Sequence, residues 1–330
     1  MNYVALLGAG FSRNWGGWLA NEAFEYLIGT PEVMADPGLR ELLWRYQDKG
    51  GFEDALAELQ EWLRPRPQPE YGIDYSMDNK LPLRSQASGL QAAIDRMFEA
   101  MNTAYNLQLE IDDAMGSFLA SFDAIFTLNQ DMLLERLYVS RLEHVTSGRV
   151  KWKGATLPGM KKAEKIGRSG GVEFWSEYLW EPKPALEFPE QPEVGLQPIY
   201  KLHGSSQRRA VSGGAPILII GGEKSRAIKQ FDVLEWYAKR FDSLLAQGTR
   251  LMVIGYGFRD QHINDALLRA ESKGLQLFIV DPMGPSGVAT SPDLKALAER
   301  TLIGASRRPI RETMRGDFAE RTKIIRFFEG

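Results

Sequence analysis

Short apolar runs that stop at glycine or at polar residues recur along the chain, with amphipathic segments between them. Runs of this length with such ends are typical of buried strands. Because strand and helix alternate, above all in the last third of the chain, the pattern predicts an α/β protein with a doubly wound parallel sheet. The expected strands span residues 3–7, 122–128, 199–202, 217–220, 251–254 and 275–280.

The amphipathic segments predict helices on both sides of these strands. The clearest ones span residues 18–28, 231–245 and 261–270. Residues 31–121 are mostly helical in pattern, since Phe52, Leu56 and neighbouring apolar residues recur at the spacing of one helical face. We expect this block to be a helical insertion packed over the sheet.

Residues 138–198 form a second insertion, which is punctuated by glycine and proline. Its aromatic residues, Trp152, Trp175, Tyr178 and Trp180, lie among lysines. A segment of this length inside a compact domain is usually functional or a small subdomain. A lid or an oligomer contact is favoured; a basic and aromatic platform for nucleic acid is the alternative.

Unusual residues follow the expected strands at their carboxyl ends. They are Gly8 and Gly10, Asn129 to Asp131, His203 and Gly204, Gly255 to Gly257, and Asp281. In a doubly wound sheet the ligand lies outside these ends. A strand, a glycine turn and a helix N-terminus can cradle a phosphate. Arg13 stands where the dinucleotide fingerprint has its third glycine, so a tight turn without a ligand is the competing interpretation.

Three polar residues at strand ends are the candidates for chemistry. Asn129 can orient a ribose hydroxyl or a water, although Asn also caps helices. Asp131 fits the capping position better, which leaves Asn129 for a ligand. Because histidine as a residue type titrates near neutral pH, His203 is a candidate to accept a proton, with a purely structural role as the alternative.

Composition narrows the class of protein. The chain has 330 residues, 44% hydrophobic and 25% charged, which is ordinary for a globular protein. A net charge of -3 gives no electrostatic footprint for nucleic acid, so we expect no direct nucleic-acid binding. No apolar run approaches a membrane helix, and no signal peptide precedes the first strand. We therefore expect a cytoplasmic protein without a membrane segment.

Cysteine is absent, and the histidines are His144, His203 and His262. The absence excludes disulfides, thiol catalysis and zinc modules built from cysteine pairs. Because the histidines are not spaced as metal-binding pairs, we expect no metal.

The strand-end motifs occur in the order of a known family. Residues 8–12, 127–131, 201–204, 222–223 and 254–257, with Asp281 closing the series, resemble the sirtuin-like NAD-binding domain. The segment 255–264 resembles sirtuin-like proteins of prokaryotic antiphage systems, namely Thoeris effectors, short Argonaute-associated subunits and partners of the HerA ATPase. The resemblance implies a Rossmann-like domain over residues 1–300, with 301–330 as a C-terminal tail that could serve assembly.

Departures from the family decide which activity the resemblance implies. The four-cysteine zinc module of the deacylases is missing. Residues 16–21 lack the Pro, Phe and Arg of the deacylase loop, and the insertion 138–198 separates motifs that are close together in deacylases. The resemblance therefore implies cleavage of NAD to nicotinamide and ADP-ribose with water as acceptor. The alternatives are a deacylase or ADP-ribosyltransferase, and a non-catalytic nucleotide-binding subunit.

The resemblance also implies a role for each matching residue. Asn129 would position the water or the ribose, His203 would act as base, and Asp131 would shape the nicotinamide side. The segment 255–264 includes His262, for which capping or packing is at least as probable as ligand contact. The expected NAD-binding residues are Gly8, Ala9, Gly10, Phe11 and Ser12 at the pyrophosphate, Gly255, Tyr256 and Gly257 at the adenosine, and Asp281 at a ribose.

An enzyme that depletes NAD must be restrained in its own cell. The resemblance therefore implies a homo-oligomer, regulated by a protein partner such as a HerA-type ATPase or a short Argonaute.

Overall fold

The computed structural model of the protein describes residues 2–63, 81–106, 113–139, 144–146, 149–165, 178–209, 216–221, 224–246 and 248–329. The chain divides into two compact units. The first contains residues 1–17, 104–218 and 225–330, and the second contains residues 18–103 and 219–224. The expectations for Trp175 and for the motif at 222–223 lie outside the described residues.

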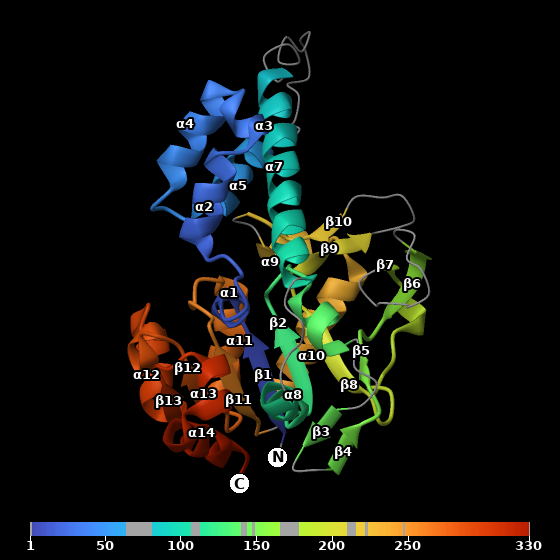
Figure 1. Cartoon of the computed structure of the whole chain (residues 1–330), viewed down its shortest axis with the longest axis vertical. Coiled ribbons are helices and arrows are strands. Elements are labelled where there is room, and N and C mark those ends of the chain that lie inside the picture. Colours follow the sequence, from blue (N-terminus) through green and yellow to red (C-terminus); the bar gives the residue numbers. More distant parts are fainter. Residues whose placement is uncertain are drawn as a thin grey trace. The chain divides into compact units, whose positions relative to one another are not determined.

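The first unit is built on a seven-stranded sheet of order β13-β12-β11-β1-β2-β8-β5 (Figure 1). Every neighbouring pair in it is parallel, which confirms the predicted doubly wound parallel sheet. Its strands are β1 (Tyr3–Leu7), β2 (Ala124–Thr127), β5 (Ala155–Thr156), β8 (Gln197–Lys201), β11 (Arg250–Ile254), β12 (Gln276–Val280) and β13 (Leu302–Ser306).

The central strands are apolar on both faces because helices cover both. Four of the five residues of β1, of β11 and of β12 are buried. The helix α10 (Asp232–Leu245) contacts α11 (Gln261–Glu271), and α11 contacts α12 (Pro292–Thr301). The helix α8 (Asp113–Ala120) contacts α13 (Ile310–Gly316), which contacts α14 (Phe318–Ile325). Right-handed crossovers place these two groups on opposite faces of the sheet.

The chain order reverses beside β1. From β1 the chain builds β2 and β8 on one side, then crosses back to build β11, β12 and β13 on the other. The reversal lies between β1 and β11, which is where doubly wound folds bind their ligands. The short helix α1 (Ala9–Arg13) follows β1 directly.

A second sheet, of order β10-β9-β7-β6, corrects one sequence prediction. Residues 217–220 were expected in the parallel sheet, but β10 (Pro216–Leu218) pairs antiparallel with β9 (Gly204–Arg209). A strand that joins a parallel sheet needs a long crossover connection from the preceding strand. Here β9 directly follows β8 in the chain, and β10 pairs antiparallel with β9. The sheet is completed by β7 (Tyr178–Pro182) and β6 (Met160–Lys165).

The described part of the insertion 138–198 is therefore largely strand. It also contains the hairpin of β3 (His144–Thr146) and β4 (Arg149–Trp152), the end of the π-helix η1 (Glu135–Val139) and the turn η3 (Ala185–Glu187). Trp152 donates from its indole nitrogen to the carbonyl of Ala120, and Trp180 is buried. At these two positions the aromatic residues are used for packing.

The second unit is helical, as the sequence predicts. Its helices are α2 (Ala20–Ile28), α3 (Pro31–Met34), α4 (Pro37–Tyr46), α5 (Gly51–Leu63) and most of α7 (Leu81–Asn106). The unit begins earlier than the expected insertion, at Trp18, and α8 belongs to the first unit.

The last thirty residues, expected to form a tail, belong to the first unit. They include the edge strand β13, α13, α14 and the turn η5 (Arg326–Phe328). Tyr3 contacts the rings of Phe327 and Phe328 at centroid distances of 5.8 and 5.4 Å. Among the described residues, no helix has the length and apolar character that a transmembrane span requires.

Candidate functional site

The loops after β1 and β11 meet backbone to backbone at the point where the chain order reverses. The Gly8 N–H donates to the Ile254 carbonyl, and the Gly10 N–H donates to the Gly255 carbonyl, both at 2.9 Å. A Cβ on Gly8 would lie 2.5 Å from the Gly255 oxygen. Gly255 has φ +64°, and a Cβ there would lie 2.4 Å from the Gly10 carbonyl carbon. These glycines are required for contact between the loops.

This contact uses backbone N–H groups that the sequence analysis assigned to phosphate binding. The N–H groups of Gly8 and Gly10 already donate to protein carbonyls, and the Phe11 N–H donates to the Gly8 carbonyl. Ala9 opens α1 at this position. Ser12 is buried, and its hydroxyl already accepts a hydrogen bond from Asn129. The contact of residues 8–12 with a pyrophosphate stays a prediction.

Asn129 joins the end of β2 to this loop. Its Nδ2 donates to the Gly8 carbonyl and to Ser12 Oγ, both at 2.9 Å. Its backbone N–H donates to Thr127 Oγ1 at 3.0 Å. Because both amide hydrogens have partners in the loop, the orientation of the amide is fixed, and its Oδ1 presents an acceptor in a set direction.

Asp131 caps the helical segment that follows, as the sequence analysis expects. Its Oδ1 accepts from the Leu133 N–H at 3.0 Å, and the side chain is buried. Burial raises the pKa of the Asp131 carboxyl, while the charge of Lys201 and hydrogen bonds from Leu133 and Ser12 oppose this increase.

A buried ion pair anchors the end of β8, and sequence reasoning missed it. Lys201 Nζ lies 2.9 Å from Glu135 Oε1, and the two side chains are only 1% and 3% exposed. The same ammonium donates to the Asp131 carbonyl and to Ser205 Oγ. A lysine inside an apolar strand requires an acidic partner when it is buried, and this was the available signal.

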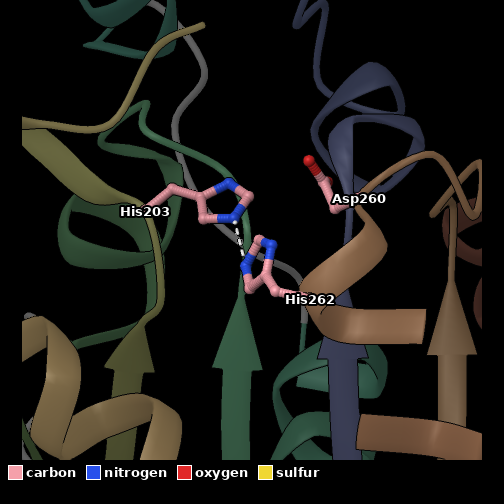
Figure 2. A group of neighbouring side chains, drawn as sticks. All are labelled: His203, Asp260 and His262. Carbon is pink, nitrogen blue, oxygen red and sulfur yellow. Dashed lines mark hydrogen bonds between the residues drawn. The ribbon is translucent and has the colours of Figure 1, made fainter. Parts of the chain in front are cut away.

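Two histidines from distant segments face each other beside this pair (Figure 2). His203, just after β8, and His262, in the first turn of α11, approach to 3.1 Å between their Nε2 atoms. A carboxylate oxygen of Asp260 and one ring nitrogen of each histidine all lie within 4.8 Å of one another. His203 is buried, and the other two residues are half-buried. The sequence analysis identified His203 but not its partners.

The loop that leads into α11, the helix of His262, is held by a buried tyrosine. The Tyr256 hydroxyl accepts from the Asp260 N–H at 3.0 Å and lies 3.1 Å from Asn264 Oδ1. Asn264 Nδ2 donates to the carbonyl of Phe258, a non-glycine residue at φ 53°. Burial raises the pKa of the Tyr256 hydroxyl. Tyr256 thus fixes the path of the loop, whereas Gly257 is exposed.

Asp281 lies at the carboxyl end of β12, as expected. Its Oδ1 accepts from the Met283 N–H at 2.8 Å and so closes the following turn. The predicted contact with a ribose hydroxyl stays a prediction.

Two of the cavities that the described residues line belong to the first unit. One of about 220 Å³ lies beside α10 and α11, with His262 and Leu202 in its wall. A larger one of about 610 Å³ lies along β13, where Arg307 and Lys323 line it. Of these two cavities, the first is lined by one member of the histidine pair, His262, and none of the residues in the Gly8 loop lines either one.

Comparison with known proteins assigns the chain to a family. The profile of the SIR2-like domain matches residues 123–301, more than half of the chain. Among solved structures, a complex of a SIR2 homologue with NAD is 14% identical, with 98% of this chain and 90% of that chain covered and a TM-score of 0.38. A Sir2 bound to an acetylated peptide is 13% identical over 98% of this chain and 94% of that chain, with a TM-score of 0.35. Among curated proteins no sequence is significantly similar.

Proposed function

We propose that this chain, which belongs to the SIR2-like domain family, cleaves NAD between nicotinamide and ribose and transfers the ADP-ribosyl group to water. The observation that carries the proposal is the geometry at the ends of β2 and β8. An oriented amide, Asn129, and a buried imidazole, His203, stand at the ends of neighbouring strands, beside the reversal point of the sheet.

The bond that breaks joins the nicotinamide nitrogen to the anomeric carbon of the ribose. Its electron pair leaves with nicotinamide, which departs as a neutral molecule, and positive charge develops on the ribose. Groups that fix oxygens around that charge and exclude bulk water lower the barrier. Water then forms the new bond to the anomeric carbon and loses one proton.

His203 is proposed to receive that proton or to orient the hydroxyl that loses it. The Nε2 atoms of His203 and His262 are 3.1 Å apart, and the tautomers of the two rings decide which nitrogen donates and which accepts. Imidazole is the side chain best suited to accept a proton near neutral pH. Asn129 is proposed to hold the water or a ribose hydroxyl through its Oδ1, since its Nδ2 is directed into the Gly8 loop.

Water is favoured as the acceptor over an acyl-lysine. The chain has no cysteine for the zinc module of the deacylases and lacks their Pro, Phe and Arg in residues 16–21. The experiment is therefore a product analysis. The purified chain, alone and with an acyl-lysine peptide, is incubated with NAD, and nicotinamide, ADP-ribose and acyl-ADP-ribose are separated by chromatography. Equal amounts of nicotinamide and ADP-ribose, independent of peptide, support the proposal. Release that depends on the peptide contradicts it.

The proposal extends to restraint of the enzyme in the cell. We propose a homo-oligomer whose NAD cleavage is released by a protein partner during phage infection, of the HerA-type ATPase or short Argonaute class that the motifs in residues 255–264 suggest. Light scattering on the chain, alone and with a candidate partner, tests the assembly. A strictly monomeric chain with full turnover contradicts it.

A further inference from the structure

The histidine pair has the composition of a metal site. His203, His262 and Asp260 supply two imidazoles and one carboxylate, and their donor atoms all lie within 4.8 Å of one another. The two Nε2 atoms are 3.1 Å apart, close to the separation of two imidazole nitrogens on one tetrahedral ion with bonds of about 2.0 to 2.1 Å. The two ring planes are inclined at 46°, and one nitrogen of each ring is directed toward the other ring (Figure 2).

The scaffold holds these donors from two directions. The buried ion pair of Lys201 and Glu135 fixes the end of β8, two residues before His203. The Tyr256 hydroxyl fixes the backbone of Asp260 through its N–H. Asp260 occupies the N-cap of α11, directly before the helix that carries His262. These contacts position the backbone on both sides of the three donors.

The donor set selects the class of ion. Imidazole suits zinc, copper, iron and nickel, whereas magnesium and calcium prefer oxygen ligands. Two histidines and one carboxylate form a three-ligand zinc set with an open position.

We propose that His203, His262 and Asp260 bind one divalent transition-metal ion, with Zn²⁺ as the probe, and that this ion inhibits the enzyme. The inhibition rests on the proposed function, because an ion held by His203 engages the imidazole that is proposed to accept a proton. The binding itself rests only on the geometry of the three side chains.

Zinc binding is measured first, without NAD, by equilibrium dialysis and elemental analysis of the intact chain after removal of any affinity tag. The wild type should bind one Zn²⁺ per chain. His262→Gln and Asp260→Asn should each weaken binding more than about tenfold. His144→Gln, which changes the third histidine of the sequence, is the matched control and should bind like the wild type.

Circular dichroism and thermal melting confirm that each variant is folded. Since the two variants change separate side chains, one of them suffices if the other fails to fold. Unchanged zinc affinity in a folded His262→Gln or Asp260→Asn variant would overturn the three-ligand site, and so would a wild type that binds no zinc.

Inhibition is measured second, as nicotinamide release with and without saturating Zn²⁺. We expect a loss of more than about tenfold that EDTA reverses, while EDTA alone leaves release unchanged or higher. Full activity with zinc bound would overturn the inhibitory role. A chain that binds zinc through these residues but never releases nicotinamide would support the metal site and contradict the proposed function. A chain that cleaves NAD but binds no zinc would do the reverse.

Discussion

Around β1 and β11 the site is made of backbone against backbone, whereas around β8 and α11 it is made of side chains. In the first half Gly8 and Gly10 donate to carbonyls of the β11 loop, and a Cβ at either position would collide with that loop. In the second half His203, His262 and Asp260 approach through their functional groups. Hydrogen-bonded backbone joins the two glycine loops, whereas the proposed chemistry is assigned to side chains.

The largest effect should come from the ion pair that supports the side-chain half. Lys201→Met leaves the Glu135 carboxylate buried without its cation, which should reduce the free energy of unfolding by about 3 to 5 kcal/mol. Urea unfolding measures this. The double variant Lys201→Met/Glu135→Leu should recover most of the loss, because an apolar pair carries no buried charge.

The control for this prediction is Lys239→Met. Lys239 pairs with Glu235 on the exposed surface of α10, where the side chains are 69% and 38% exposed. Such a pair contributes about 0.5 kcal/mol or less. Equal losses in Lys201→Met and Lys239→Met would show that the buried pair is not a support of the site.

The backbone half is tested by Gly255→Ala. The new Cβ would lie 2.4 to 2.5 Å from backbone atoms of Gly10 and Phe11, in a left-handed conformation. Steric and conformational costs together predict a loss of about 3 kcal/mol in the free energy of unfolding. Gly257→Ala is the matched control, since a Cβ there meets nothing within 4 Å. A stable Gly255→Ala variant would mean that the loops do not pack as described.

A smaller effect, on the pH dependence of the free energy of unfolding, is expected at Asp131. Burial raises the pKa of its carboxyl in the folded chain, so folding favours the protonated form. The cost of ionisation is absent below the unfolded pKa of about 3.9 and grows as the pH rises toward the folded pKa. Asp131→Asn should therefore gain stability relative to the wild type on going from acidic to neutral pH.

Unfolding of the wild type and Asp131→Asn across this range checks the sign. Asp48→Asn, at an exposed carboxylate, is the control. A stability difference between the wild type and Asp131→Asn that is independent of pH, or that moves in the opposite direction, would contradict the account.

The two halves also differ in how far the sequence could predict them. The strands, their parallel order and the glycine loops follow from apolar runs and their ends, because these signals are local. The apolar run 217–220 has the same local signal, yet β10 (Pro216–Leu218) pairs antiparallel with β9, the strand that follows β8 in the chain. The glycine pattern predicted that the N–H groups of Gly8 and Gly10 face a phosphate. In the structure both donate to carbonyls of the β11 loop, and a local sequence pattern cannot show a contact with a distant loop.

The histidine cluster could not be predicted for a different reason. His203 and His262 are 59 positions apart, on segments that follow β8 and β11, and two strands lie between these in the sheet. Only the path of the loop held by Tyr256 brings them together. The expectation of no metal came from the absence of close spacing between histidines, which has no bearing on donors that meet through the fold.

Nicotinamide release by active-site variants tests the central claim most directly. The rate is measured by chromatography for the wild type, Asn129→Ala, His203→Ala and the double variant, each with the partner if one is required. Asn21→Ala, at an exposed position of α2, is the control. Each single change should lower the rate by about a hundredfold or more while the chain stays folded and the control stays fully active. Full activity in the double variant would contradict the assignment of these residues to NAD cleavage.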